Sequence, residues 1–140
     1  MQHPSEQSRS SIHAGPGQAP LAWVRQVRNG LSVDEVSGIA GYLSLPLSEV
    51  ATRLAIPART LARRKREGVL SVEESEKVLR ALRVIARANA VFGDGEKAAL
   101  WIKSENPALE GETPFALLDT DVGGEAVMDA LGRIEHGLIA

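Results

Sequence analysis

Three arginine side chains gather on one face of a short predicted helix near the middle of the chain. In "ARTLARRKREG", residues 58–68, Arg59, Arg63 and Arg66 fall within about 60° of one another when successive residues are placed about 100° apart, as in an α-helix. Leu61 lies roughly opposite and can point into a core. Because a guanidinium group binds phosphates and can bond both O6 and N7 of guanine, this pattern predicts contact with DNA.

A second predicted helix precedes the arginine-rich one at the spacing of a helix-turn-helix motif. Residues 47–54 are amphipathic, and Pro57 suits the first turn of the next helix because its missing N–H would have no intrahelical partner there. Residues near the start of a recognition helix meet base edges, whereas Arg64 and Lys65 lie off the stripe and are expected to reach phosphates. The candidate DNA-binding residues are Ala58, Arg59, Thr60, Ala62, Arg63, Arg64 and Arg66.

Two other interpretations of the arginines remain open at this stage. The charged run can be a solvated helix face, and the front of the chain can be a helical module that docks a protein instead of DNA. Ala55 also occupies the turn position that usually holds glycine. Either alanine adopts a left-handed conformation there, at a cost of about 1–2 kcal/mol, or the turn has a different geometry.

Enzyme and metal chemistry find little support in the residue types. The chain has no cysteine, and its three histidines, His3, His13 and His136, are not spaced as metal ligands. "FGDGE" resembles a glycine turn, but no predicted strand precedes it, so a phosphate-binding loop is not expected. We therefore predict no catalytic residue, no metal and no cofactor.

Charge divides the chain into two unlike parts. Residues 21–92 hold 12 Lys+Arg and 7 Asp+Glu, a net charge of +5, whereas residues 93–140 hold 3 and 10, a net charge of −7. Such asymmetry suggests a different partner for each part. Residues 1–20, rich in Ser, Gln, Pro and Gly, are predicted to be a disordered tail. With no apolar run near the ~20 residues of a membrane span, a cytoplasmic protein is expected.

Helical periodicity predicts an all-α fold, and no segment alternates with a period of two. Two capping boxes are expected, one from Ser32 and Glu35 and one from Ser71 and Glu74, the second opening a long helix that ends near Phe92. The division is a helix-turn-helix domain over residues 21–92 and a small helical domain over residues 93–140. The remaining helices are expected at about residues 21–28, 47–54, 57–66, 96–103 and 124–131, with a turn at 114–118.

The order of short motifs in the second part is similar to a known family. After the FGD turn come Trp101, Asn106-Pro107 and a run from Leu117 to Thr120, followed by Gly124, Val127, Leu131, Ile134 and Gly137. This order resembles the toxin-binding domain of Xre/MbcA/ParS-type antitoxins. Upstream, "TLARRKREGVLSVEESEKVLR" resembles the Xre-like helix-turn-helix domain of the same family. Together the two resemblances cover roughly 120 of the 140 residues.

The resemblance implies two activities on one chain. Such antitoxins pair with RES-domain toxins, which resemble NAD-using ADP-ribosyl-transfer enzymes, and cover the NAD pocket with their C-terminal end. Their front domain represses the operon that encodes both proteins, and members typically dimerise within a larger toxin–antitoxin assembly. The runner-up is a plain transcription regulator whose second part dimerises or senses a ligand. The candidate toxin-binding residues are Asn106, Leu109, Glu110, Glu112, Arg133, His136, Gly137, Leu138, Ile139 and Ala140.

Overall fold

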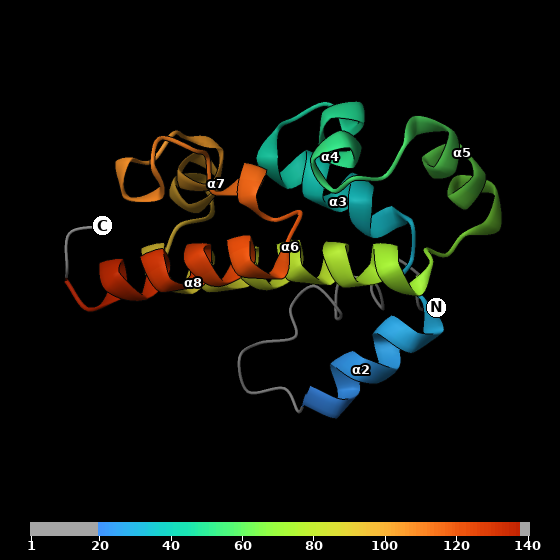
Figure 1. Ribbon diagram of the computed structural model, residues 1–140, viewed down its shortest axis with the longest axis horizontal. Helices are drawn as coiled ribbons and strands as arrows, with labels where there is room; N and C mark the ends of the chain where they lie inside the picture. The colour runs from blue at the N-terminus through green and yellow to red at the C-terminus, as the bar shows by residue number, and fades with distance from the viewer. Residues whose placement is uncertain (1–19, 138–140) are drawn as a thin grey trace, which may run out of the picture.

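The computed structural model, which describes residues 20–137, packs a set of helices around one long central helix (Figure 1). Within these residues the only β-type pairing is an isolated bridge between Ser32 and Val69, so the all-α prediction is confirmed. The elements are α2 (Pro20–Asn29), α3 (Asp34–Leu43), α4 (Leu47–Arg53), α5 (Ala58–Glu67), α6 (Val72–Phe92), α7 (Gly95–Lys103), the 3-10 helices η1 (Pro107–Leu109) and η2 (Phe115–Leu117), and α8 (Asp121–Glu135).

Two sets of predicted residues lie outside the described part of the chain. Residues 1–19 of the expected disordered tail are among them, while Pro20 is the first residue of α2. Leu138, Ile139 and Ala140, named above as candidate toxin contacts, are also outside it.

The central helix α6 begins and ends where the sequence predicts. The Ser71 hydroxyl accepts a hydrogen bond from the Glu74 backbone N–H at 3.1 Å, and the Glu74 carboxylate accepts one from the Ser71 N–H at 2.9 Å. This reciprocal pair satisfies two backbone donors that a helix start leaves without partners. At the other end, Gly93 takes a left-handed conformation with φ of 68° and closes the helix. The predicted capping box at Ser71 is therefore confirmed.

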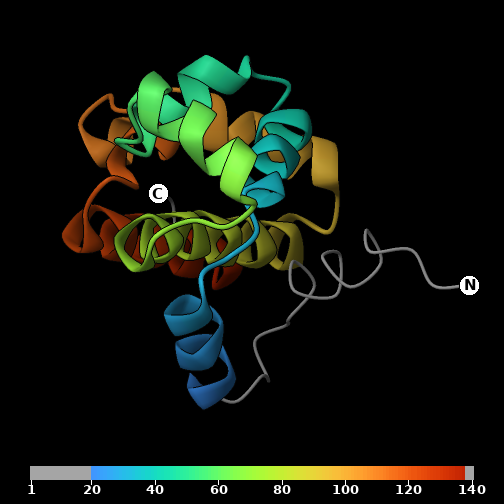
Figure 2. The same ribbon diagram turned by 90° about the vertical axis from the view of Figure 1, so that its right-hand side faces the viewer.

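All other helices are arranged about α6. Figures 1 and 2 show α3, α4 and α5 on one side of it and α2 on the other, while α7 and α8 follow its C-terminal half. The Tyr42 hydroxyl of α3 donates to Asn89 Oδ1 of α6 at 2.6 Å. Buried side chains from Leu31 to Leu131 form one continuous cluster. The predicted boundary at residues 92 and 93 coincides with the end of α6, but a single core runs past it, and a division into two domains stays a prediction.

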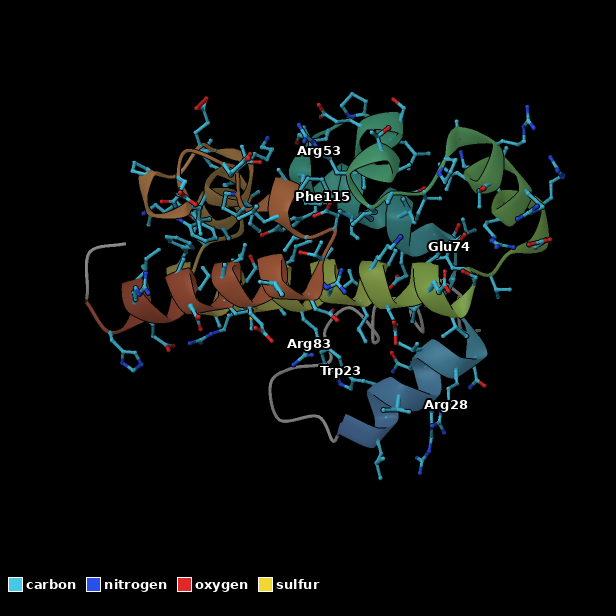
Figure 3. The ribbon with its side chains drawn as sticks, in the orientation of Figure 1. Trp23, Arg28, Arg53, Glu74, Arg83 and Phe115 are labelled. Carbon is cyan, nitrogen blue, oxygen red and sulfur yellow. The ribbon has the colours of Figure 1, made fainter. Side chains whose placement is uncertain are left out.

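The arginines of α6 contact neighbouring helices, and Arg80 and Arg87 are half-buried, while Arg83 is exposed. Arg80 pairs with Asp121 and donates to the Leu118 carbonyl at 2.9 Å, and Arg87 pairs with Glu135, so both ends of α8 are tied to α6. The Arg83 guanidinium carbon lies 4.9 Å from the ring centroid of Trp23 in α2, which is a cation–π contact (Figure 3). The arginines of α6 thus join it to α2 and to α8.

The capping box predicted at Ser32 and Glu35 is not formed. Helix α3 begins at Asp34, and its N-cap, Val33, makes no side-chain cap bond. Instead, backbone bonds pair residues 31–33 with 68–70, which fixes the entry into the helix and leaves Glu35 3% exposed, with Oε2 lacking a hydrogen-bond partner among the described residues. Burial, with a smaller contribution from Asp34, raises the pKa of Glu35 to about 7.

The last helix is longer than predicted. It was expected at about residues 124–131, yet α8 runs from Asp121 to Glu135. Thr120 caps it, its hydroxyl accepting from the Gly123 N–H at 3.0 Å. Adjacent glycines at 123 and 124 disfavour a helix by intrinsic propensity, but the packing of α8 on α6 and its ion pairs outweigh that preference.

Candidate functional site

The predicted helix-turn-helix is formed by α4 and α5. Val50, Leu54 and Ile56 are each at most 1% exposed and, with the 7% exposed Leu61, make the shared core of the two helices. Pro57 stands just outside α5 as its N-cap, one residue earlier than the predicted place, and its carbonyl accepts the first helical hydrogen bond from the Leu61 N–H at 2.9 Å.

The turn between the helices uses a left-handed alanine. Ala55 has φ of 56°, and the Ile56 N–H donates to the Ala51 carbonyl at 2.8 Å to close the turn. Of the two possibilities left open by the sequence, the strained one holds. Alanine in this conformation costs about 1–2 kcal/mol relative to an unstrained backbone.

The arginine stripe, defined as Arg59, Arg63 and Arg66, is exposed on α5. None of the three makes an ion pair within the described residues, and Leu61 is the one buried side chain of the helix. Figure 1 places α5 at one end of the molecule, away from α7 and α8. The other predicted DNA-binding positions of α5 are also exposed, except for the half-buried Thr60 and Arg64.

Arg64 differs from the stripe because two carboxylates surround it. Its Nε donates to Glu74 Oε1 at 2.7 Å and its Nη1 donates to Glu67 Oε1 at 2.9 Å. Figure 3 shows Glu74 at the start of α6, beneath α5. Hydrogen bonds from Glu74 and then Glu67 raise the pKa of Arg64 further above its usual value, so it stays charged. Arg64, which is expected from the sequence to bind a DNA phosphate, is therefore already bonded to carboxylates of the protein itself.

One exposed cation of the helix-turn-helix is not among the predicted DNA-binding residues. Arg53 is the last residue of α4 and is exposed, and Figure 3 shows it above α6 and well to the left of α5. In helix-turn-helix proteins the first helix crosses the DNA backbone, so this position suits a phosphate contact. The signal in the sequence was a lone basic residue ending the first helix of the motif.

The predicted toxin-binding residues do not all face outward. Asn106 is 7% exposed, its side-chain Oδ1 accepts from the Ala108 N–H at 2.9 Å, and its backbone bonds Gly111 and Glu112. It organises the loop that carries η1, and it presents little surface to a partner. Glu110 and Glu112 are exposed in the same loop, and Leu109 is half-buried against the core.

A shallow hollow lies between this loop and the end of α8. It is lined by Trp101, Ser104, Glu105, Asn106, Pro107 and Ile134. Trp101 and Ile134 are half-buried, and Trp101 packs on Phe92 with ring centroids 5.9 Å apart. Leu100, which precedes Trp101, is 64% exposed. Arg133, His136 and Gly137 are exposed at the end of α8.

This hollow is not predicted from the sequence. Five of its six lining residues come from one stretch, residues 101–107, but the sixth, Ile134, comes from α8, and only the fold brings it beside them. Leu100 is not among the lining residues, but it falls on the polar side of α7, opposite the buried Ala98 and Ile102. A leucine on a polar helix face is a candidate partner contact.

The described residues contain neither a candidate metal site nor a candidate membrane-spanning helix. Among residues 20–137, no group of three or more His, Asp or Glu side chains could hold a metal ion. No helix in that part of the chain is long and apolar enough to cross a membrane.

Comparison with known proteins gives two family matches that fit this geometry. Residues 22–83 match the antitoxin Xre-like helix-turn-helix domain, and residues 87–137 match the antitoxin Xre/MbcA/ParS C-terminal toxin-binding domain. A protein named antitoxin Xre from Yersinia enterocolitica is 35% identical over 127 residues, covering 89% of this chain and 86% of the relative. An antitoxin Xre from Photorhabdus laumondii is 34% identical over 116 residues, covering 81% and 78% respectively.

The resemblance inferred from the motifs is thus confirmed, and with it the expectation of a binding protein rather than an enzyme. The exposed arginine stripe lies inside the matched helix-turn-helix segment, and the hollow lies inside the matched toxin-binding segment. This chain belongs to the Xre family of antitoxins, with a DNA-binding helix-turn-helix domain followed by a toxin-binding domain.

Proposed function

We propose that this antitoxin neutralises a RES-domain toxin that consumes NAD, by covering the toxin's active site with its C-terminal segment, and that it represses its own operon in the cytoplasm. The observation that carries the proposal is the presence of two unlike surfaces on one fold. One is the arginine stripe of α5, and the other is the end of the molecule formed by α7, the η1 loop and the end of α8, where Glu105, Glu110 and Glu112 are exposed.

The DNA-binding half of the proposal is supported by the arrangement of α5. Leu61 anchors the helix, so Arg59 and Arg63, in its first two turns, face outward where base edges and phosphates would lie. A single recognition helix reads only a few base pairs, so we propose that the antitoxin binds as a homodimer on paired half-sites.

The toxin-binding half is supported by charge and by exposed apolar surface. Residues 93–140 carry a net charge of −7, which favours association with a cationic pocket built for nucleotide phosphates. Trp101 lines the hollow together with Ile134 of α8, and its neighbour Leu100 is 64% exposed on α7. The assignment of the toxin to the RES class follows the family resemblance.

Replacing Arg63 with alanine is expected to weaken binding to the operon's upstream DNA by roughly tenfold to a hundredfold, as for the loss of one bidentate guanine contact. If Arg63 instead neutralises a phosphate, the slope of log K against the logarithm of the salt concentration should become smaller in magnitude by about 0.9. Fluorescence anisotropy at several salt concentrations measures both quantities. Lys97→Ala, which removes an exposed positive charge from α7, is the matched control. Equal binding by the Arg63 variant and the wild type would contradict a DNA-reading role.

Deleting residues 138–140 is expected to abolish protection of cellular NAD while leaving DNA binding intact. The antitoxin and its neighbouring toxin are co-expressed, NAD is measured, and complex formation is followed by gel filtration. The Arg63→Ala variant should show the reverse behaviour, with full neutralisation and weak DNA binding. Unchanged neutralisation by the shortened chain would overturn occlusion by the C-terminal segment, and failure of the intact antitoxin to protect NAD would overturn the RES assignment.

A further inference from the structure

The recognition helix α5 has few internal anchors. Leu61 is its one buried side chain, and the helix is joined to α6 by a short link from Gly68 to Ser71, in which Gly68 has φ of 90°. Backbone hydrogen bonds at Ile56 and Gly68 hold the two ends of α5, but a single buried side chain between them does not by itself fix the rotation of the helix. The direction of the arginine stripe therefore depends on a second tie that fixes the rotation of α5.

Arg64 supplies a tie of this kind. It lies about 100° around the helix from Arg63, which turns it toward α6. Its Nε and Nη2 donate to the two oxygens of Glu74, at 2.7 Å and 3.3 Å, and both side chains are partly covered, at 18% and 13% exposed. A two-point contact between guanidinium and carboxylate fixes orientation as well as distance.

Glu74 is itself held in place by the capping box of α6. Its Oε1 accepts from the Ser71 N–H at 2.9 Å, so the carboxylate that receives Arg64 cannot move independently of the helix start. Burial would raise the pKa of Glu74, but the hydrogen bonds from Arg64 and Ser71 outweigh burial and lower it. The carboxylate remains ionised and available to the guanidinium near neutral pH.

We propose that Arg64 is a positioning residue for DNA recognition: through Glu74 it locks the rotation of α5 on α6, and it is not a phosphate ligand. The inference rests on the proposed DNA-binding function. Three nitrogens of its guanidinium donate to carboxylates, because Nη1 also bonds Glu67 at 2.9 Å. A DNA phosphate would have to displace these carboxylates before it could bind the Arg64 guanidinium, whose positive charge they already neutralise.

The decisive variant is Glu74→Gln. Glutamine preserves the capping box, so the start of α6 is kept, but it removes the charged partner of Arg64. Loss of a carboxylate near DNA favours binding electrostatically. A positioning role predicts the opposite change in affinity for the specific site. Affinity for a duplex from upstream of the protein's own gene should fall about tenfold, comparable to losing one good base contact. Affinity for a random duplex of equal length should not fall.

Glu73→Gln is the matched control, since Glu73 is exposed in the same helical turn and makes no ion pair within the described part of the chain. It should leave the ratio of specific to random binding unchanged. A second measurement is the salt slope of Arg64→Ala on random DNA. The positioning role predicts the wild-type slope, whereas a phosphate contact predicts a slope smaller by about 0.9.

The outcomes separate this inference from the function on which it rests. If wild-type protein does not discriminate the upstream duplex from the random one, the proposed repressor function fails. If the wild type discriminates but Glu74→Gln binds the specific duplex as tightly or more tightly, or if Arg64→Ala flattens the slope, the positioning role alone is overturned.

Discussion

Alanine at position 123 is expected to lower the free energy of unfolding by about 3 kcal/mol, the upper end of the usual cost of overpacking. A Cβ atom there would lie 1.9 Å from the Leu117 carbonyl oxygen and 3.0 Å from Thr120 Oγ1. The first obstacle is backbone, so it cannot be relieved by a change of rotamer. Either the start of α8 or the η2 turn must move, and the cap that Thr120 gives to the Gly123 N–H is expected to be lost.

Gly132, in the same helix, gives a control with the opposite sign. A Cβ atom at Gly132 meets nothing within 4 Å, so Gly132→Ala is expected to stabilise the protein by up to about 1 kcal/mol through helix propensity. Urea unfolding followed by circular dichroism measures both variants. Destabilisation of similar size in the two variants would show that a general intolerance of side chains on α8, rather than the contact at Leu117, sets the cost.

Replacing Glu35 with glutamine is expected to raise the free energy of unfolding at high pH, relative to low pH, by about 3 kcal/mol. This figure takes about 1.4 kcal/mol for each unit between the folded-state pKa of Glu35 and its ordinary pKa. The folded-state pKa of Glu35 is about 7 and its ordinary value is 4.5. The folded state therefore holds the proton more tightly than the unfolded state. The resulting stability is fully present below pH 4.5, falls as pH rises, and is lost once pH passes about 7.

The measurement is the difference in unfolding free energy between variant and wild type at pH 4.5, 6 and 8. The difference should grow in favour of Glu35→Gln as pH increases, because glutamine does not ionise. Glu49→Gln removes a carboxylate from the exposed surface of α4 and serves as the control, with an expected effect within about 0.5 kcal/mol. A difference that stays constant across this range would show that Glu35 does not titrate as proposed.

The two capping boxes show how far the sequence alone can predict the fold. Ser71 and Glu74 and Ser32 and Glu35 have the same spacing, yet only the first pair forms the reciprocal bonds. The difference lies in backbone pairing between residues 31–33 and 68–70, which are far apart in the chain. Helical periodicity reports local preference, so it located the helices but could not show which cap a tertiary contact would override.

The same reasoning separates the predictable from the unpredictable part of the candidate site. The arginine stripe follows from residue spacing on one helix, and the structure leaves it exposed. The partner of Arg64 lies ten residues further on, in another helix, and the meeting depends on how the chain turns at Gly68. Asn106 was assigned to the toxin surface by motif, but its hydrogen bonds hold its own loop.

The helix α6 has a consequence for exchanging partners between relatives. The matched helix-turn-helix segment ends at residue 83 and the matched toxin-binding segment begins at residue 87, so both meet within this helix. A chimera spliced there would join two half-helices whose inward faces fit different neighbours. Exchanging toxin preference without losing the fold therefore requires the whole of α6 to be transferred together with α7 and α8. The packing of α2 and α3 on the transferred helix must then be redesigned.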